Sequence, residues 1–337
     1  MAVLVAAVLL GLAHARPSAV GRSRVRAPAL VRAEVAVEVD EFLSCISADG
    51  SVSAKAIVAT RMVRDITDKQ GCQPLASAAL GRAMICGLLV ADGLKGDESV
   101  QLRFNGDGPL RGVLAIANGA LEVKGYVGNP QVNLPLKPNG KIDVGAGVGN
   151  GQLFVVRTKM LPGEEYPSVY SSICEIQSGE VAEDVNYYLS ESEQKQGALA
   201  AGIYISADGN GGAGVTAACG WQVQLLPFAD ESAVAQLEMN LNALSAMSPT
   251  KMVLSGMRPR EILSALLDGM DPEFFEPRAP RLATCCSDER AWRTLALLPR
   301  DEVEQIIADN EKIEIRCEFC AEMRTVSPEQ IRERLEL

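Results

Sequence analysis

The sequence predicts an α+β protein in which a mixed sheet domain is followed by a helical linker and a small cysteine-rich domain. Predicted strands and helices follow one another without the strict alternation of a parallel α/β fold. Amphipathic helical patterns then dominate residues 228–283, and four of the nine cysteines fall within residues 284–337. We therefore divide the 337 residues into a targeting segment (1–33), an α+β core (34–227), a helical linker (228–283) and a C-terminal domain (284–337).

The composition limits the classes of function. A hydrophobic content of 47% in 337 residues is enough to bury a sizeable core. The net charge of −11 argues against a protein that neutralises nucleic-acid phosphates, so we expect no nucleic-acid partner. The only histidine is His14, inside the targeting segment. Catalytic triads and metal sites that need histidine are therefore not expected in the mature protein.

The first 33 residues have the composition of a targeting segment. Residues 2–13 form an apolar run too short to span a bilayer, and Ala13-His14-Ala15 suits a signal peptidase. Five arginines follow before the first acidic residue, Glu34, as in an organelle transit peptide. We expect import into a plastid stroma through a signal followed by a transit segment, with no membrane-bound mature form. A mitochondrial presequence and a plain secretory signal are the alternatives.

Periodicity and turn residues predict the elements of the core. We expect helices over residues 54–67 and from Pro74 onward, the second almost entirely apolar and therefore buried. Strands over 99–104, 112–117 and 121–127 are expected to form an antiparallel meander. Residues 130–150, rich in Pro, Asn and Gly, are expected to be irregular. The remaining predicted elements are strands over 34–45, 152–159 and 166–174, a helix over 180–195, and a hairpin of 199–206 with 215–225.

One glycine-rich stretch fits a nucleotide-binding pattern by its letters. Gly209, Gly211 and Gly214 match G-x-G-x-x-G, but a phosphate-binding loop of this kind must lead into a helix. The residues from Val215 onward instead have the pattern of a strand, so we interpret the glycines as a hairpin loop. No Walker motif occurs either. Nucleotide chemistry is not predicted.

The linker contains predicted helices over 231–244 and 258–267 and half of the ten methionines. These are Met239, Met247, Met252, Met257 and Met270. Methionine is flexible and polarisable, so such a cluster suits a surface that repacks around varied apolar partners. The simpler interpretation, which the pattern alone favours, is an ordinary helical core.

The cysteines fall into two groups. Five stand singly among apolar residues and are expected to be buried thiols: Cys45, Cys72, Cys86, Cys174 and Cys219. The other four form an adjacent pair, Cys285 and Cys286, and a C-x-x-C pair, Cys317 and Cys320. Two close pairs joined by a spacer of thirty residues can supply a tetrahedral thiolate zinc site. A redox-active zinc element, a structural zinc knuckle, a disulfide-stapled tail and two unrelated thiol pairs all remain open at this point.

The C-terminal domain has little material for a core of its own. It carries eight basic and thirteen acidic residues, which leave a net charge of −5. Short helices are expected over 288–298 and 300–309, a strand leading to the C-x-x-C turn, and a last helix capped at Ser327. A structural thiolate zinc site contributes on the order of 10 kcal/mol of folding free energy. Oxidation of its thiolates to disulfides would expel the metal, so a thiol oxidation would act as a folding switch.

Several motifs together make the sequence resemble the heat shock protein 33 family, from about Val35 to the C-terminus. They are Gly106-Asp107-Gly108-Pro109-Leu110, Val148-Gly149-Asn150-Gly151, Tyr188 with Ser190-Glu191-Ser192-Glu193-Gln194, Cys286-Ser287-Asp288-Glu289-Arg290, Leu298-Pro299-Arg300-Asp301-Glu302-Val303, and Cys317-Glu318-Phe319-Cys320. The resemblance implies that Cys286, Cys317 and Cys320 are zinc ligands. The family position of the first ligand falls on Thr284, and Cys285 stands one place later. Cys285 would be the fourth ligand only with a local kink, because adjacent side chains of an extended chain point in opposite directions.

The resemblance also implies a function. Members of this family are redox-regulated holdase chaperones that bind unfolding client proteins without ATP, so we expect no enzymatic activity. Oxidation would pair Cys317 with Cys320, release zinc, unfold the tail and linker, and expose an apolar client surface, and the active form would be a homodimer. The usual partner disulfide between the first two cysteines would be strained between neighbours Cys285 and Cys286. The alternatives are a constitutive zinc-knuckle interaction module and a zinc-dependent enzyme using Glu289 or Glu318.

Overall fold

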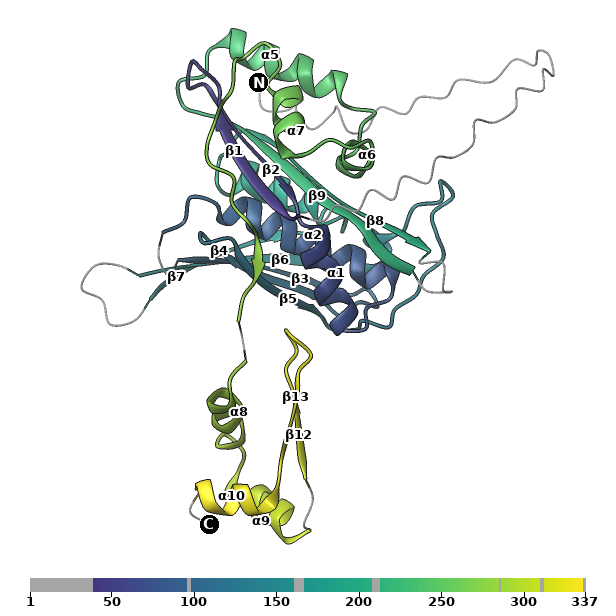
Figure 1. Cartoon of the computed structure of the whole chain (residues 1–337), viewed down its shortest axis with the longest axis vertical. Coiled ribbons are helices and arrows are strands. Elements are labelled where there is room, and N and C mark those ends of the chain that lie inside the picture. The colour runs from purple at the N-terminus through teal and green to yellow at the C-terminus, as the bar shows by residue number, and fades with distance from the viewer. Residues whose placement is uncertain are drawn as a thin grey trace, which may run out of the picture.

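The computed structural model describes residues 39–95, 98–160, 167–207, 213–284, 286–309 and 312–335. The predicted targeting segment and the first part of the predicted strand 34–45 lie outside these residues. An antiparallel sheet, a mixed sheet, a helix between them, a helical layer and a projecting tail make up the described chain (Figure 1). The predicted α+β class is confirmed.

The first sheet has the strand order β10-β1-β2-β9-β8, and all its neighbours are antiparallel. The second has the order β11-β5-β4-β3-β6-β7, antiparallel except for β11 beside β5. The predicted meander is confirmed as β3, β4 and β5. The strands are β1 (Glu41–Ile46), β2 (Val52–Val58), β3 (Ser99–Gly106), β4 (Val113–Asn118), β5 (Glu122–Val127), β6 (Gly151–Lys159), β7 (Ser168–Glu175), β8 (Gly197–Ala207), β9 (Ala213–Leu225), β10 (Glu273–Phe274) and β11 (Arg281–Leu282).

Helix α2 (Pro74–Ala91) lies between the two sheets and contacts strands of both (Figure 1). It is long and apolar enough to cross a membrane, but 89% of it is buried inside the protein. Its approach to its neighbours is close: a Cβ on Gly81 would lie 2.7 Å from the Cδ1 atom of Ile203. The expected burial of this helix is confirmed, and it forms the centre of the first apolar core.

The predicted helix over residues 54–67 is wrong in its first half. Residues Val52–Val58 form β2, and α1 (Thr60–Lys69) begins only at Thr60. Both faces of β2 are covered, and over Val52–Ala56 its buried residues alternate with half-buried ones as in a strand. The helical spacing was misleading because it grouped Ile57, which belongs to β2, with the apolar residues of α1. The start of α1 is capped from a distance, because the Asp40 carboxylate accepts hydrogen bonds from the backbone N–H groups of Arg61 (2.9 Å) and Met62 (2.7 Å).

Two shorter helices complete the core. Helix α3 (Val144–Val148) interrupts the stretch predicted to be irregular, and α4 (Ala182–Glu191) packs against β8. Strands β8 and β9 pair antiparallel, as the hairpin prediction requires. The glycine-rich connection between them, residues 208–212, lies outside the described residues.

The linker helices cover the outer face of the first sheet. They are α5 (Glu231–Ala243), α6 (Pro249–Leu254), which was not predicted, and α7 (Pro259–Leu266). Together with β1, β2 and β9 they enclose a second apolar core. Met252 and Met270 are buried in it, Met247 and Met257 pack against it, and Met239 is 60% exposed. In this conformation, therefore, four of the five linker methionines belong to a helical core.

Residues 273–283, the last part of the linker, which we call the strap, run across both sheets from the linker helices to the tail (Figure 1). At one end β10 pairs with β1, and at the other β11 pairs with β5. Between them Arg278 exchanges backbone hydrogen bonds with Phe42 (2.8 and 2.9 Å), and its guanidinium forms an ion pair with Asp92. The strap therefore attaches to the core mainly through its backbone.

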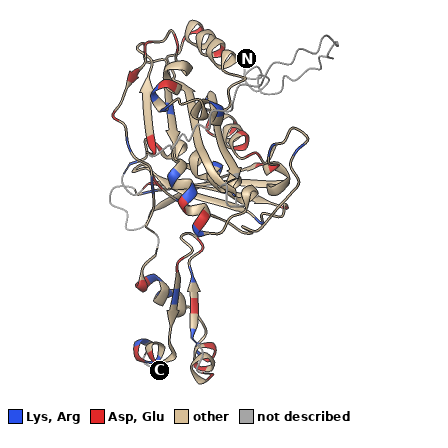
Figure 2. Ribbon diagram, turned by 45° about the vertical axis from the view of Figure 1, so that its right-hand side comes forward, with Lys and Arg blue, Asp and Glu red and all other residues tan. Residues whose placement is uncertain are grey.

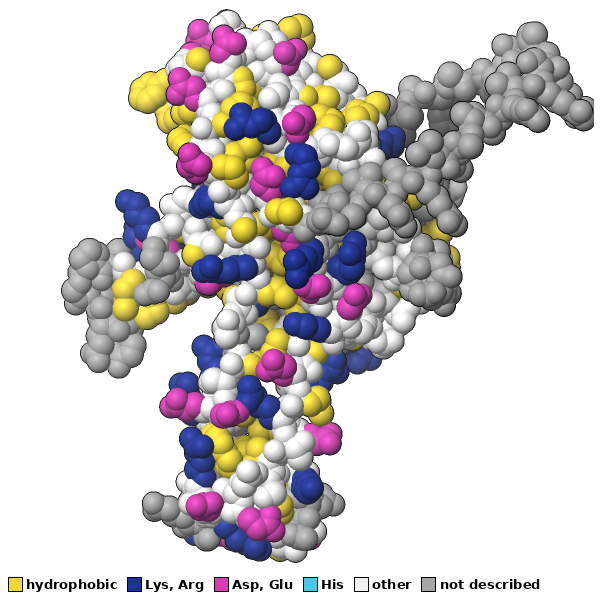
Figure 3. Space-filling view, in the orientation of Figure 1, with side chains coloured by type: hydrophobic (Ala, Val, Ile, Leu, Met, Phe, Trp, Pro, Cys, Tyr) yellow, Lys and Arg dark blue, Asp and Glu magenta, His cyan; other side chains and the backbone are white. Residues whose placement is uncertain are grey.

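The tail is a narrow projection from the core, with charged side chains along its helices and hairpin (Figures 2 and 3). It consists of α8 (Asp288–Leu295), α9 (Arg300–Ala308), a hairpin of β12 (Ile313–Arg316) and β13 (Met323–Val326), and α10 (Pro328–Leu335). Its apolar cluster has five buried members: Leu295, Val303, Ile307, Val326 and Ile331.

Candidate metal centre

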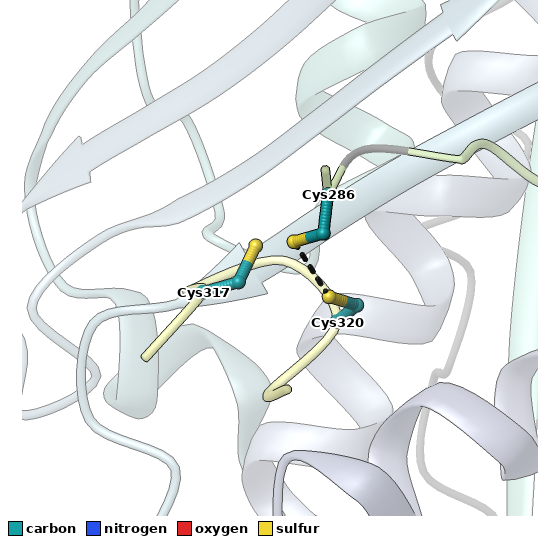
Figure 4. Close-up of side chains that lie close together, drawn as sticks. All are labelled: Cys286, Cys317 and Cys320. Atoms are coloured by element: carbon teal, nitrogen blue, oxygen red, sulfur yellow. Dashed lines mark hydrogen bonds between the residues drawn. The ribbon is translucent and has the colours of Figure 1, made fainter. Parts of the chain in front are cut away.

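Three of the four cysteines predicted to bind a metal lie together where the tail meets the core (Figure 4). The sulfur atoms of Cys286, Cys317 and Cys320 all lie within 4.8 Å of one another. The sulfurs of Cys286 and Cys320 are 3.0 Å apart. All three residues are half-buried, and none of the eight described cysteines forms a disulfide. This triad can hold a metal ion.

The C-x-x-C pair is placed by the tight turn between β12 and β13. The backbone N–H of Cys317 donates to the carbonyl of Glu322 (3.0 Å), and that of Ala321 donates to the carbonyl of Cys317 (2.8 Å). Ala321 has a φ of 58°, the left-handed conformation that closes the turn. The hairpin therefore directs both thiols to the same side.

Cys286 reaches the hairpin from a different segment, just before α8. Ser287 caps this helix by accepting a hydrogen bond from the N–H of Arg290 (3.2 Å). Asp288, the first residue of α8, forms an ion pair with Arg324 on β13. The cap and the ion pair together fix the start of α8 beside the hairpin.

The environment of the triad favours the thiolate form that metals bind. Burial acts to raise the pKa of the Cys317 thiol, but hydrogen bonds from Cys286 and from the N–H groups of Cys320 and Phe319 outweigh it and lower this pKa to about 7. In the core, burial raises the pKa of Cys45, Cys72 and Cys86 to about 12. Cys45, Cys86 and Cys219 are buried as predicted, and Cys72 and Cys174 are half-buried.

The triad fits a zinc ion of thiolate coordination. Thiolates about 2.3 Å from a tetrahedral zinc lie about 3.8 Å apart, so the three sulfurs need only small shifts to hold one. Cys285 lies outside the described residues, and the neighbouring Thr284 is exposed. Whether Cys285 completes the site stays a prediction. Glu289 and Glu318, the acids considered for a zinc enzyme, are both exposed.

Sequence reasoning did not find the residues on which the C-x-x-C turn rests. The ring of Phe319, between the two cysteines, packs edge-on against Tyr126 of β5, with ring centres 5.3 Å apart. The Nζ atom of Lys124 lies 5.0 Å from the centre of the Phe319 ring, and the Gln70 amide donates to the Phe319 carbonyl (2.8 Å). The only feature of the sequence that could have indicated this contact is the aromatic residue between the two cysteines of the C-x-x-C turn.

Comparison with known proteins gives one consistent result. The family described as "Hsp33 protein" matches residues 40–327. A "33 kDa chaperonin" of Symbiobacterium thermophilum is 40% identical over 293 residues, which cover 87% of this chain and 96% of the relative. A protein of the same name from a Nostoc species is 40% identical over 296 residues, covering 87% and 94% of the two chains.

A solved structure agrees. The crystal structure of the 33 kDa chaperonin (heat shock protein 33 homologue) of Thermotoga maritima superposes with a TM-score of 0.78 at 28% identity, covering 88% of this chain and 98% of the other. The fold and the thiol cluster define an α+β protein with a cysteine-rich tail, and the relatives that share them are named chaperonins. The chain belongs to the Hsp33 family.

Proposed function

We propose that this protein is a redox-regulated holdase that binds unfolding proteins without ATP when its tail thiols are oxidised. One observation carries the proposal: three thiols from two segments converge in a tail whose described residues include six buried apolar side chains, and the strap joins that tail to the linker helices that cover a sheet. A tail this poor in core depends on the thiol cluster for its fold.

In the reduced state the linker helices keep an apolar face covered. Side chains of β1, β2 and β9, among them Leu43, Ala56 and Val223, are at most 1% exposed beneath α5, α6 and α7. Release of these helices would expose this face together with the methionines packed on it. Such a flexible apolar surface suits many unfolded partners.

The switch is a two-electron oxidation. The thiolates of Cys317 and Cys320 give two electrons to hydrogen peroxide, form one S–S bond and lose their capacity to hold a metal, while two protons and the peroxide yield two water molecules. A bound zinc would supply the folding free energy of the tail and keep these thiols deprotonated. The hairpin turn already places the two sulfurs within 4.8 Å of each other.

The test is a peroxide titration of the zinc-loaded protein at elevated temperature. We would follow zinc release, suppression of the aggregation of an unfolding client, and pulse alkylation of core cysteines after the peroxide is quenched. Cys45 and Cys219 lie in the core beneath the linker, whereas Cys86 lies in the core around α2. We expect Cys45 and Cys219 to become reactive as protection appears, with Cys86 remaining protected.

The variant carrying Cys317→Ser and Cys320→Ser separates the switch from the chaperone activity. If this variant suppresses client aggregation with or without peroxide, the redox switch is lost while the chaperone activity remains. Zinc release from the unaltered protein without any gain of client protection would contradict the holdase proposal. Size-exclusion chromatography of the oxidised protein would test the implied homodimer.

We also propose that residues 1–33 direct the protein to a plastid stroma. The proposal is supported by the apolar run followed by five arginines without an acidic residue. Fusion of these residues to a fluorescent protein would test it. Accumulation of the fusion in mitochondria would replace this proposal with its alternative.

A further inference from the structure

We propose that strand β5 couples the metal centre to the strap, through a docking contact made by Phe319 of the tail with Gln70, Lys124 and Tyr126 of the core. This inference rests on the proposed function, because it concerns how the state of the thiols is transmitted. Gln70, Lys124 and Tyr126 would act as positioning residues: they touch the turn that carries Cys317 and Cys320, not the metal.

The aromatic contact depends on the shape of the C-x-x-C turn. The Phe319 ring meets Tyr126 at an interplanar angle of 83° and lies 5.0 Å from the Lys124 ammonium. Edge-to-face and cation–π contacts of this kind require defined positions of both partners. Phe319 is held between two cysteines of the triad, so a rearrangement of Cys317 and Cys320 moves its ring away from β5.

Gln70 supplies a second, independent link. Gln70 is the C-cap residue of α1 and is 6% exposed. Its Nε2 atom donates to the carbonyl of Gly125 on β5 and to the carbonyl of Phe319, both at 2.8 Å. A buried amide N–H without a partner is costly, so the docked turn satisfies a group of the core as well as its own.

The strap attaches to the same strand. The backbone N–H of Arg281 donates to the carbonyl of Leu121 (3.0 Å) and that of Ala283 to the carbonyl of Val123 (2.8 Å). The Arg281 guanidinium also pairs with Glu122 (2.9 Å). Ala283 is three residues before Cys286. β5 therefore holds the chain on the way to the first cysteine and, on its outer face, the turn that carries the other two.

The attachments of the strap and of the C-x-x-C turn to β5 are both small, so we expect each to depend on the other. β11 has two residues, and the turn contributes one aromatic ring and one carbonyl. When the metal-bound triad joins Cys286 to the turn, undocking of one segment shifts the other. Weakening the aromatic contact should then open the strap without removing the metal. An aromatic pair corresponds to roughly a two- to tenfold change in an opening equilibrium.

The test compares Tyr126→Leu with Tyr170→Leu, a matched control on edge strand β7, where Tyr170 is 57% exposed. Both variants are prepared as zinc-loaded full-length reduced protein. Hydrogen exchange followed by mass spectrometry of a peptide covering residues 278–284 reports the strap, and zinc content reports the metal centre. We expect Tyr126→Leu to keep its zinc, to exchange roughly two- to tenfold faster at residues 281 and 283, and to respond to less peroxide. Tyr126→Phe should restore slow exchange.

Equal exchange at residues 281 and 283 in Tyr126→Leu and Tyr170→Leu would overturn the coupling. Loss of zinc in Tyr126→Leu before any change of exchange would overturn it too, because the residue would then act on the metal site alone. Lys124→Met removes the cation–π contact and leaves the aromatic pair in place. We expect it to accelerate exchange at residues 281 and 283 less than Tyr126→Leu does. Faster exchange in the reduced variant, followed by zinc release on oxidation that brings no client protection, would support the coupling and contradict the holdase proposal.

Discussion

The core and the tail use cysteine and apolar burial in opposite ways. In the core, sixteen of the eighteen residues of α2 are buried, and burial raises the pKa of the Cys86 thiol in this helix to about 12. The described part of the tail has six buried apolar side chains, and hydrogen bonds lower the pKa of Cys317 to about 7. We therefore expect the core to keep its fold whatever the redox state and the tail to depend on its thiols.

Loss of one cysteine of the triad should unfold the tail and leave the core intact. For Cys317→Ser we expect loss of most of the metal-dependent folding free energy of the tail, on the order of 10 kcal/mol. Hydrogen exchange would show fast exchange over residues 288–335 and unchanged protection over 74–91. Cys72→Ser, in the half-buried core group, is the control and should retain a protected tail. A protected tail in Cys317→Ser would mean that its apolar cluster suffices.

Truncation of a buried side chain should destabilise only the region, core or tail, that contains it. Leu89 in α2 is fully buried, so Leu89→Ala should lower the free energy of unfolding of the core by about 2–5 kcal/mol. Leu295 in the tail is 3% exposed, and Leu295→Ala should leave the core transition unchanged while speeding exchange in α8. Urea unfolding followed by circular dichroism checks both. A loss of core stability in Leu295→Ala would show that the two regions unfold together.

Alkaline pH should destabilise the core through its buried thiols. The pKa of Cys86 is raised from 9.0 to about 12 by burial, so the unfolded chain loses this proton first as the pH rises. The stabilisation is fully present below pH 9 and is lost between pH 9 and about 12, at about 1.4 kcal/mol per pH unit. Urea midpoints between pH 8.5 and 10.5 should show a shallower pH dependence in Cys86→Ala. Equal slopes would contradict the assigned burial.

The cap of α8 should have the smallest effect. Ser287 accepts a hydrogen bond from the N–H of Arg290, and Ser287→Ala should destabilise the tail by about 1 kcal/mol. The expected result is moderately faster exchange in residues 288–295 with zinc retained. Ser287→Asp, which preserves a capping oxygen, serves as the control. An effect as large as that of Cys317→Ser would assign Ser287 a direct role in the metal centre.

The sequence predicted elements whose signals are local. The buried helix α2, the meander, the short helices of the tail and the convergence of Cys286, Cys317 and Cys320 all follow from periodicity, turn residues or spacing. Helix α6 was missed although Ser248 and Pro249 form a cap signature, because six residues are too few to show a period. β2 was misassigned because Ile57, its sixth residue, was grouped with Met62, Val63 and Ile66 of α1, and this spacing was followed in place of the alternation over Val52–Ala56.

Features that join distant residues could not be predicted. Asp40 caps a helix that begins twenty residues later, and the Gln70 amide meets a carbonyl 249 residues away. Neither side chain differs in its local sequence from an ordinary exposed polar residue. Their roles appear only when the fold sets the partner opposite them.

The two ends of the strap are attached to the core with different strength, and this determines the order in which the chain can leave the core. Each end has two backbone hydrogen bonds and one ion pair, but the Arg281–Glu122 pair at the tail end is more exposed than the Arg278–Asp92 pair. Arg278 also makes a cation–π contact with Phe42. Detachment that begins at the cysteines therefore meets a weak attachment first and a stronger one second. A brief oxidant pulse would free only the last residues, so that a thiol reductant that cleaves the disulfide lets β11 pair with β5 again, whereas a sustained pulse would detach the chain past Arg278 and release the linker helices. The protein would in this way respond to the duration of a stress as well as to its strength.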